Sequence, residues 1–172
     1  MLKTRIFLFH PNLRQSRVNR ILANEAEKKG VEVRDMYELY PDFKVDASVE
    51  QSVLEDTDTI VFQFPMYWYS SPALMKEWLD TVLEYGWAYG SNGHALRGKK
   101  VILAITQGAS EIDYTEDGRF HVTTETLLKP FEVISYHTGL VFQPPFILSG
   151  TLGISDEELQ ERAKDYVNYL RK

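Results

Sequence analysis

The sequence of 172 residues contains no cysteine, which excludes disulfide bonds, thiolate metal sites, iron–sulfur clusters and a cysteine nucleophile. No apolar run approaches the roughly 18 residues that a membrane-spanning helix needs. Basic residues are the minority, 19 against 25 acidic, and the net charge of −6 disfavours binding to nucleic acid or anionic lipid. We expect no signal peptide, and the lack of cysteine is typical of a cytoplasmic protein.

Several motifs of catalysis and ligand binding are also missing. The chain has no GxGxxG and no GxxxxGK[ST] sequence, which disfavours a dinucleotide-binding Rossmann fold and a P-loop. It has no Gly-x-Ser-x-Gly elbow, which disfavours a serine hydrolase of the α/β type. The four histidines, at positions 10, 94, 121 and 137, are scattered without ligand spacing, so no metal site is predicted.

Apolar runs alternate with amphipathic segments along the whole chain. The apolar runs predict strands at residues 6–9, 31–37, 59–64, 101–105 and 140–148, the last interrupted by Pro144 and Pro145. The amphipathic segments predict helices at 18–29, 49–54, 72–83, 124–136 with a kink or break at Pro130, and 155–170.

This alternation predicts an α/β protein whose strands are buried on both faces. We expect one domain over residues 1–172, a three-layer sandwich around a five-stranded parallel sheet in the order 2-1-3-4-5. In that order ligands bind beyond the carboxyl ends of the strands, at the switch point between the first and third strands. The candidate residues should therefore follow the first, third and fourth strands.

The loop after the first strand is basic, since no acidic residue occurs before Glu25. The helix that follows has free N–H groups at its start, and Ser16 with its neighbouring arginines would strengthen their attraction for a phosphate. The alternative is that Ser16 only caps the helix and the arginines are solvated.

The loop after the third strand holds three consecutive aromatic residues, Tyr67, Trp68 and Tyr69. Aromatic rings in a loop can form a flat wall for a planar conjugated ligand, although an oligomer contact or a small local core would also use them. After the fourth strand, Gly108 and Ala109 allow the backbone to approach a ligand closely. A phosphate anchor, an aromatic wall and a close backbone approach together suit a flavin mononucleotide.

The stretch FPMYWYSSPALMKEWLD at 64–80, continued by GWAYG at 86–90, resembles the flavodoxin-like NAD(P)H:quinone oxidoreductase family. This family includes the DT-diaphorases, the bacterial modulator of drug activity B and the ancillary proteins of glutathione-gated Kef potassium efflux systems. The resemblance covers nearly the whole chain and implies a flavodoxin-like fold. It also implies a homodimer whose active sites lie at the subunit interface.

The resemblance also implies which residues bind the flavin and which face the quinone. His10 matches a histidine that touches the flavin, and Tyr114 and His121 match the catalytic tyrosine and histidine, with one extra residue between them here. Ser16, Arg17, Val18 and Asn19 match the segment that binds the flavin phosphate. The segment along the flavin ring is matched by Pro65, Met66, Tyr67, Trp68 and Tyr69. A Thr-Thr-Gly-Gly segment is matched by Thr106, Gln107, Gly108 and Ala109. The chain departs from the last pattern at Gln107 and Ala109.

The function implied is ping-pong, two-electron hydride transfer from NAD(P)H by way of FMN to a quinone, with FAD as the other cofactor left open. The alternative is a regulatory ancillary subunit of a potassium efflux transporter, attached peripherally to the inner face of the membrane, with its flavin a sensor or absent. A third interpretation is one-electron transfer, as in flavodoxins.

Overall fold

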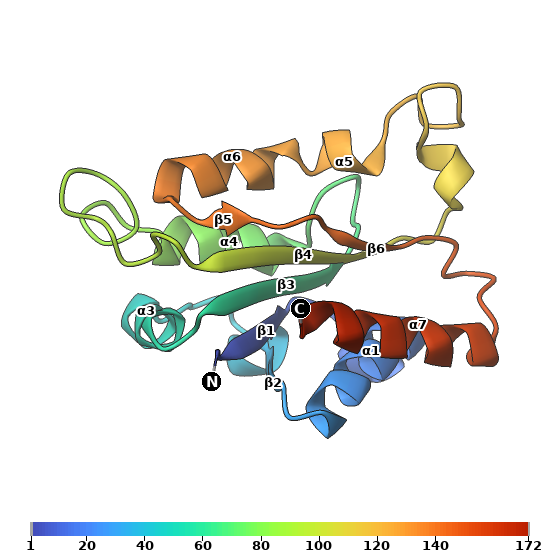
Figure 1. Cartoon of the computed structure of the whole chain (residues 1–172), viewed down its shortest axis with the longest axis horizontal. Coiled ribbons are helices and arrows are strands. Elements are labelled where there is room, and N and C mark those ends of the chain that lie inside the picture. The colour runs from blue at the N-terminus through green and yellow to red at the C-terminus, as the bar shows by residue number, and fades with distance from the viewer. Residues whose placement is uncertain (1, 172) are drawn as a thin grey trace.

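The computed structural model describes residues 2–171 and has one sheet with helices on both faces (Figure 1). The strands run in the order β2-β1-β3-β4-β5, and β6 also pairs with β4. Every pairing is parallel. The strands are β1 (Thr4–Leu8), β2 (Glu32–Asp35), β3 (Thr59–Pro65), β4 (Lys100–Thr106), β5 (Val141–Phe142) and β6 (Phe146–Leu148). The predicted flavodoxin-like fold and strand order are confirmed.

The helices divide into two layers. They are α1 (Arg17–Lys28), α2 (Met36–Leu39), α3 (Ala47–Glu55), α4 (Ala73–Val82), α5 (Thr124–Leu127), α6 (Lys129–Thr138) and α7 (Asp156–Leu170). Helices α1 and α7 cover one face over the smaller core, whereas α2, α3, α4 and α6 cover the other face over the larger core. Figure 1 shows α5 and α6 on the opposite side of the sheet from α1 and α7. No helix within residues 2–171 is long and apolar enough to cross a membrane.

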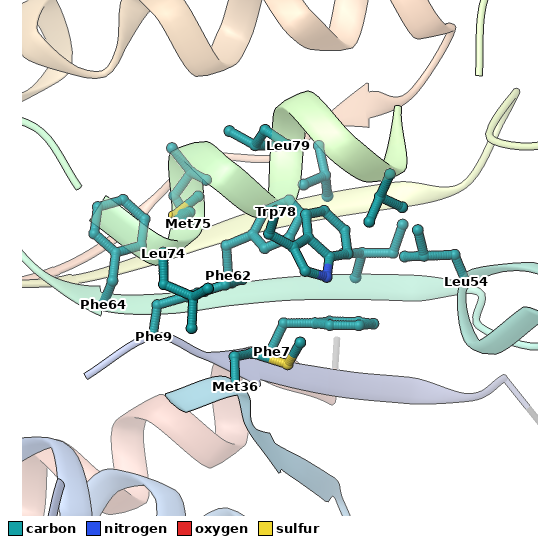
Figure 2. Packing of buried hydrophobic residues seen from close by; sticks show 14 of the residues in the cluster. Phe7, Phe9, Met36, Leu54, Phe62, Phe64, Leu74, Met75, Trp78 and Leu79 are labelled. Carbon is teal, nitrogen blue, oxygen red and sulfur yellow. The ribbon is translucent and has the colours of Figure 1, made fainter. Parts of the chain in front are cut away.

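Trp78 of α4 is the centre of the larger core (Figure 2). Its ring is fully buried and lies 5.5 Å from Phe7 and 5.4 Å from Phe62, measured between ring centroids. Its indole N–H donates to the buried carboxylate of Glu50, which also pairs with Arg34. The aromatic contacts fix α4 over β1 and β3, and with it the end of the loop that joins β3 to α4.

The ends of most predicted elements differ from the structure by one or two residues, and the predicted helix at 124–136 is divided into α5 and α6 just before Pro130. The second strand stops at Asp35 rather than residue 37, because the Asp35 carboxylate accepts the N–H of Glu38 and so begins α2. The fifth strand is divided into β5 and β6, because Pro144 and Pro145 offer no N–H to the sheet. Both halves still pair with β4, β5 at the start of that strand and β6 at its end.

Candidate functional site

Four chain segments meet at the carboxyl edge of the sheet, on the right of Figure 1. They follow β1, β3, β4 and β6, and backbone hydrogen bonds join neighbouring segments to one another. The N–H of Met66, just beyond β3, donates to the Thr106 carbonyl at 2.8 Å. The N–H of Gln107, just beyond β4, donates to the Leu148 carbonyl at 2.9 Å. The edge is therefore a continuous backbone surface.

The segment after β1 presents mostly backbone to this edge. Ser16 caps α1 and accepts the N–H of Asn19 at 3.2 Å, while the side chains of Val18 and Asn19 are buried. The guanidinium of Arg17 pairs with Asp156 and donates to the Ile154 carbonyl. A phosphate at this helix end would therefore meet backbone N–H groups and the Ser16 hydroxyl, and Arg17 would have to leave α7 to reach it.

His10 is half-buried, and Nδ1 of its ring accepts the N–H of Asn12 at 3.0 Å. Because Nδ1 acts as an acceptor, the proton of the neutral ring is on Nε2, which can donate to a ligand. Burial lowers the pKa of His10 below its ordinary value of 6.5, so the neutral form prevails near pH 7.

A buried polar network ties α1 to the end of the sheet. The Asn19 side-chain amide donates to the Thr106 hydroxyl at 2.9 Å. Gln63 of β3 donates to the Asn19 carbonyl at 3.1 Å and accepts the hydroxyl of Tyr166 at 3.1 Å. Each of these polar groups is paired, which offsets the cost of burying them. The network fixes the start of α1 relative to β3 and β4.

The aromatic residues after β3 form a strained turn. Tyr67 and Ser70 exchange both backbone hydrogen bonds, at 3.1 and 3.0 Å, and the two residues between them have positive φ. These are Trp68 at 47° and Tyr69 at 63°, the signs that a type I′ turn needs. Such turns favour asparagine and glycine, so two bulky rings here carry strain of the kind found at functional sites. The Trp68 side chain is 92% exposed.

The segment after β4 has two free backbone donors. The N–H groups of Gly108 and Ala109 have no acceptor within residues 2–171, whereas the N–H of Gln107 is bonded to the end of β6. The Gln107 side chain is 2% exposed and bonds to Thr124 and Ser149. The Gln107 side chain is therefore committed to these two hydroxyls, and the amides of Gly108 and Ala109 are the backbone donors of this segment that remain for a ligand within residues 2–171.

Tyr114 lies at the end of the short helix η2 (Glu111–Tyr114) and is 8% exposed. Its ring contacts Phe120 at 4.8 Å between centroids, and Phe120 contacts Tyr69 at 5.3 Å, so the loops after β3 and β4 meet through three aromatic rings. Burial, together with the nearby Tyr69 and Asp113, raises the pKa of the Tyr114 phenol above its ordinary value. The phenol therefore stays protonated at neutral pH.

His121 lies beyond this aromatic group, with an exposed side chain and a φ of 53°. Its Nδ1 is 3.2 Å from the Glu116 carbonyl. Because a carbonyl only accepts, this contact places a proton on Nδ1 and leaves Nε2 for a ligand. Tyr114 and Tyr69 are thus joined through Phe120, whereas His121 lies on a separate turn.

Two parts of the edge were missed by the sequence analysis. Phe120 joins Tyr69 to Tyr114, and its only sequence signal was its place next to His121. The loop at 149–153 follows β6 and bonds to the segment after β4, with the Gly150 N–H 2.7 Å from the Ala109 carbonyl. Two glycines in this loop, at 150 and 153, could have indicated a close backbone approach.

Two hollows border the edge. One of about 720 Å³ runs between α4 and α6, begins at Ser70 and Ser71, and has largely apolar walls that include Leu79 and Phe131. The other, of about 650 Å³, is polar and borders Tyr114.

The residues present suit a planar heteroaromatic ligand with a phosphate tail. The free amides of Gly108 and Ala109 can donate to ring heteroatoms, and the α1 end can receive the phosphate. The exposed ring of Trp68 can stack on a flat surface. These three features fit the flavin mononucleotide that the sequence analysis expects.

Comparison with known proteins places residues 3–170 in the family described as having a flavodoxin-like fold. A Bacillus subtilis protein named as an uncharacterized NAD(P)H oxidoreductase, YrkL, is 46% identical, with 99% of this chain and 98% of that protein covered. An Enterobacter glutathione-regulated potassium-efflux system ancillary protein, KefF, is 43% identical, with 96% and 93% covered. The structure titled general stress protein 14 in complex with FMN, from Treponema denticola, has a TM-score of 0.94 and 38% identity, with 98% of each chain covered.

The strain in the aromatic turn predicts that Trp68→Asn stabilises the protein in the absence of ligand. Asparagine tolerates the left-handed backbone and the exposed indole contributes little packing, so the free energy of unfolding should rise by about 1 kcal/mol. Urea denaturation measures the change. Trp68→Ala is the control, since alanine also lacks the ring but keeps the strained backbone. Equal stabilities of the two variants would contradict strain at this position.

Proposed function

The chain belongs to the flavodoxin-like fold family, and from this membership we propose that it transfers hydride from NAD(P)H, by way of FMN, to a quinone in ping-pong order. It is a flavin-dependent oxidoreductase. The observation that carries the proposal is the pair of free amides at Gly108 and Ala109 beside an exposed aromatic turn, on a chain related over its full length to an FMN-bound protein. FMN, when bound, supplies the hydride acceptor and donor.

The chain's own residues bind and orient. The start of α1, with Ser16, holds the phosphate, and His10 donates from Nε2. The amides of Gly108 and Ala109 hold the polar edge of the ring system, where fixed backbone donors stabilise negative charge without reorganising. Ala109 adds a methyl group to a segment in which the family pattern has glycine, and the free N–H of this residue keeps the donor in place.

Tyr114 and His121 are the residues we assign to the quinone. The Tyr114 phenol, protonated at neutral pH, donates a hydrogen bond to a quinone oxygen. His121, with Nδ1 directed at the Glu116 carbonyl, has its Nε2 available to a ligand. In the imidazolium form Nε2 can give up a proton, so the two residues supply a hydrogen bond and a proton respectively.

The same site is proposed to lie at the interface of a homodimer. The apolar groove between α4 and α6 begins at Ser70 and Ser71, immediately after the aromatic turn. A second copy seated in this groove would therefore reach the edge of the flavin site. In the groove wall, Val133 is 58% exposed although it lies between half-buried neighbours on α6.

We expect Val133→Asp to shift the protein from dimer to monomer, because a carboxylate in an apolar contact loses its water without gaining a partner. Sedimentation velocity across a concentration series measures the change. The control is Val49→Asp on α3, where the side chain is 46% exposed and outside the groove. A monomeric wild-type protein, or a Val133→Asp variant that dimerises like the wild type, would contradict the proposed interface.

The cofactor proposal predicts that the purified protein binds FMN and that NADPH or NADH bleaches its visible bands under anaerobic conditions. Absorption spectra before and after addition of FMN, FAD and then the nicotinamide test this directly. Bleaching followed by reoxidation with a quinone supports the full reaction. Failure to bind either flavin would contradict it.

A second expectation concerns the assignment of Tyr114 and His121. The double variant Tyr114→Phe, His121→Ala should retain bound flavin and its bleaching by NADPH, but lose about a hundredfold or more in quinone turnover, as removal of a general acid typically does. Stopped-flow measurement of the two half-reactions separates these effects. Equal quinone reoxidation rates for the variant and the wild type would remove both residues from the mechanism.

The similarity to KefF supports a second candidate function, the regulation of a potassium efflux transporter at the membrane. The two functions predict different results for the purified protein. Turnover with quinone in the isolated protein favours the enzyme, whereas negligible turnover together with co-purification with a transporter favours the ancillary role.

A further inference from the structure

We propose that Gln107 is a positioning residue, which holds the loop at 149–153 against the segment after β4 and so fixes the free amides of Gly108 and Ala109 in their ligand-facing form. The inference rests on the proposed function, because those amides are the donors assigned to the flavin. It also gives a role to a residue at which this chain departs from the family's Thr-Thr-Gly-Gly pattern.

The Gln107 side chain joins three segments that are distant in the sequence. Its Nε2 donates to the Ser149 hydroxyl at 2.8 Å and to the Thr124 hydroxyl at 3.0 Å, and its Oε1 accepts from Thr124 at 3.2 Å. Gln107 is 2% exposed and Thr124 is 4% exposed. The end of β4, the start of α5 and the loop after β6 are therefore held together in a site with little access for water.

The Gln107 backbone makes a second set of contacts, with the end of β6 and with the same loop. Its N–H donates to the Leu148 carbonyl, and its carbonyl accepts both the N–H and the hydroxyl of Thr151, each at 3.2 Å. The Ala109 carbonyl accepts the Gly150 N–H at 2.7 Å. The loop thus occupies the carbonyls of residues 107 and 109, and within residues 2–171 the amides of residues 108 and 109 are the backbone donors of this segment that remain for a ligand.

The loop also approaches Gly108 from the outside. A Cβ atom built at position 108 would lie 3.2 Å from the side chain of Leu152, closer than ordinary van der Waals contact. The loop and the segment after β4 therefore share one surface of contact, and a displaced loop would leave Gly108 free to rotate its peptide. Threonine, the residue in the family pattern, is too short to bridge to both hydroxyls as glutamine does.

A substitution that removes only the hydrogen bonds tests this role. Gln107→Met keeps the length of the side chain and its packing but not its polar atoms. We expect the dissociation constant for FMN, measured by fluorescence titration, to rise about tenfold, the effect of losing one to two net hydrogen bonds. In the ligand-free protein, amide hydrogen exchange at Gly150 and Thr151 should accelerate by a similar factor, because these N–H groups close the loop onto residues 107 and 109.

Two further variants separate positioning from general stability. Gln107→Glu has the same length and can accept from both hydroxyls, so it should slow exchange in the loop relative to the methionine variant. Thr57→Val removes a buried hydroxyl that bonds to Val53 and Arg5 at the opposite end of the sheet. It should lower the melting temperature and leave both FMN binding and exchange in the loop unchanged.

The outcomes are distinct. A lower melting temperature for Gln107→Met, with FMN affinity and loop exchange at wild-type values, would reduce Gln107 to a packing residue and overturn the proposal. Accelerated exchange with unchanged FMN affinity would overturn it as well, since the loop would then have no bearing on the site. A wild-type protein that binds no flavin would instead remove the proposed function, and the exchange data would still report whether Gln107 holds the loop.

Discussion

The parallel pairing of β4 with strands on both of its sides is the constraint on which the rest of the structure depends. Its pairing with β3 brings the Met66 N–H onto the Thr106 carbonyl, and its pairing with β6 brings Gln107 onto Leu148. Because β4 is hydrogen-bonded to strands on both sides, its backbone groups are paired within the sheet. Unpaired backbone groups can therefore occur only beyond its end. The unpaired amides of Gly108 and Ala109 arise at that point.

The aromatic turn and the polar network have different roles at the site. The network of Asn19, Gln63 and Thr106 is fully paired and fixes the elements, whereas the turn at Trp68 and Tyr69 is strained and projects from them. This separation is physically reasonable, because a rigid support can tolerate local strain that a loosely packed one would release. Contact between Tyr69 and Phe120 then connects the strained turn to the loop that carries Tyr114.

Much of the fold could be predicted because it depends on local patterns. Apolar runs predict the strands, their alternation with helices predicts the order of the sheet, and the prolines at 144 and 145 predict the interruption of the fifth strand. The direction of the Gln107 side chain could not be predicted, since it is set by Thr124 and Ser149, which are 17 and 42 residues away. The loop after β6 was missed for the same reason: it belongs to the site only because β6 pairs with β4.

The three tryptophans occupy very different surroundings, and this has an optical consequence. Trp78 is fully buried against other rings, and Trp87 is half-buried with its N–H on Glu55. Trp68 alone projects into water, 92% exposed, from the turn that faces the proposed ligand. Its emission is expected at the long-wavelength side of the protein's fluorescence, so stacking of a flat molecule on that turn would quench the red edge first. The unlabelled chain thus carries its own reporter of what binds there.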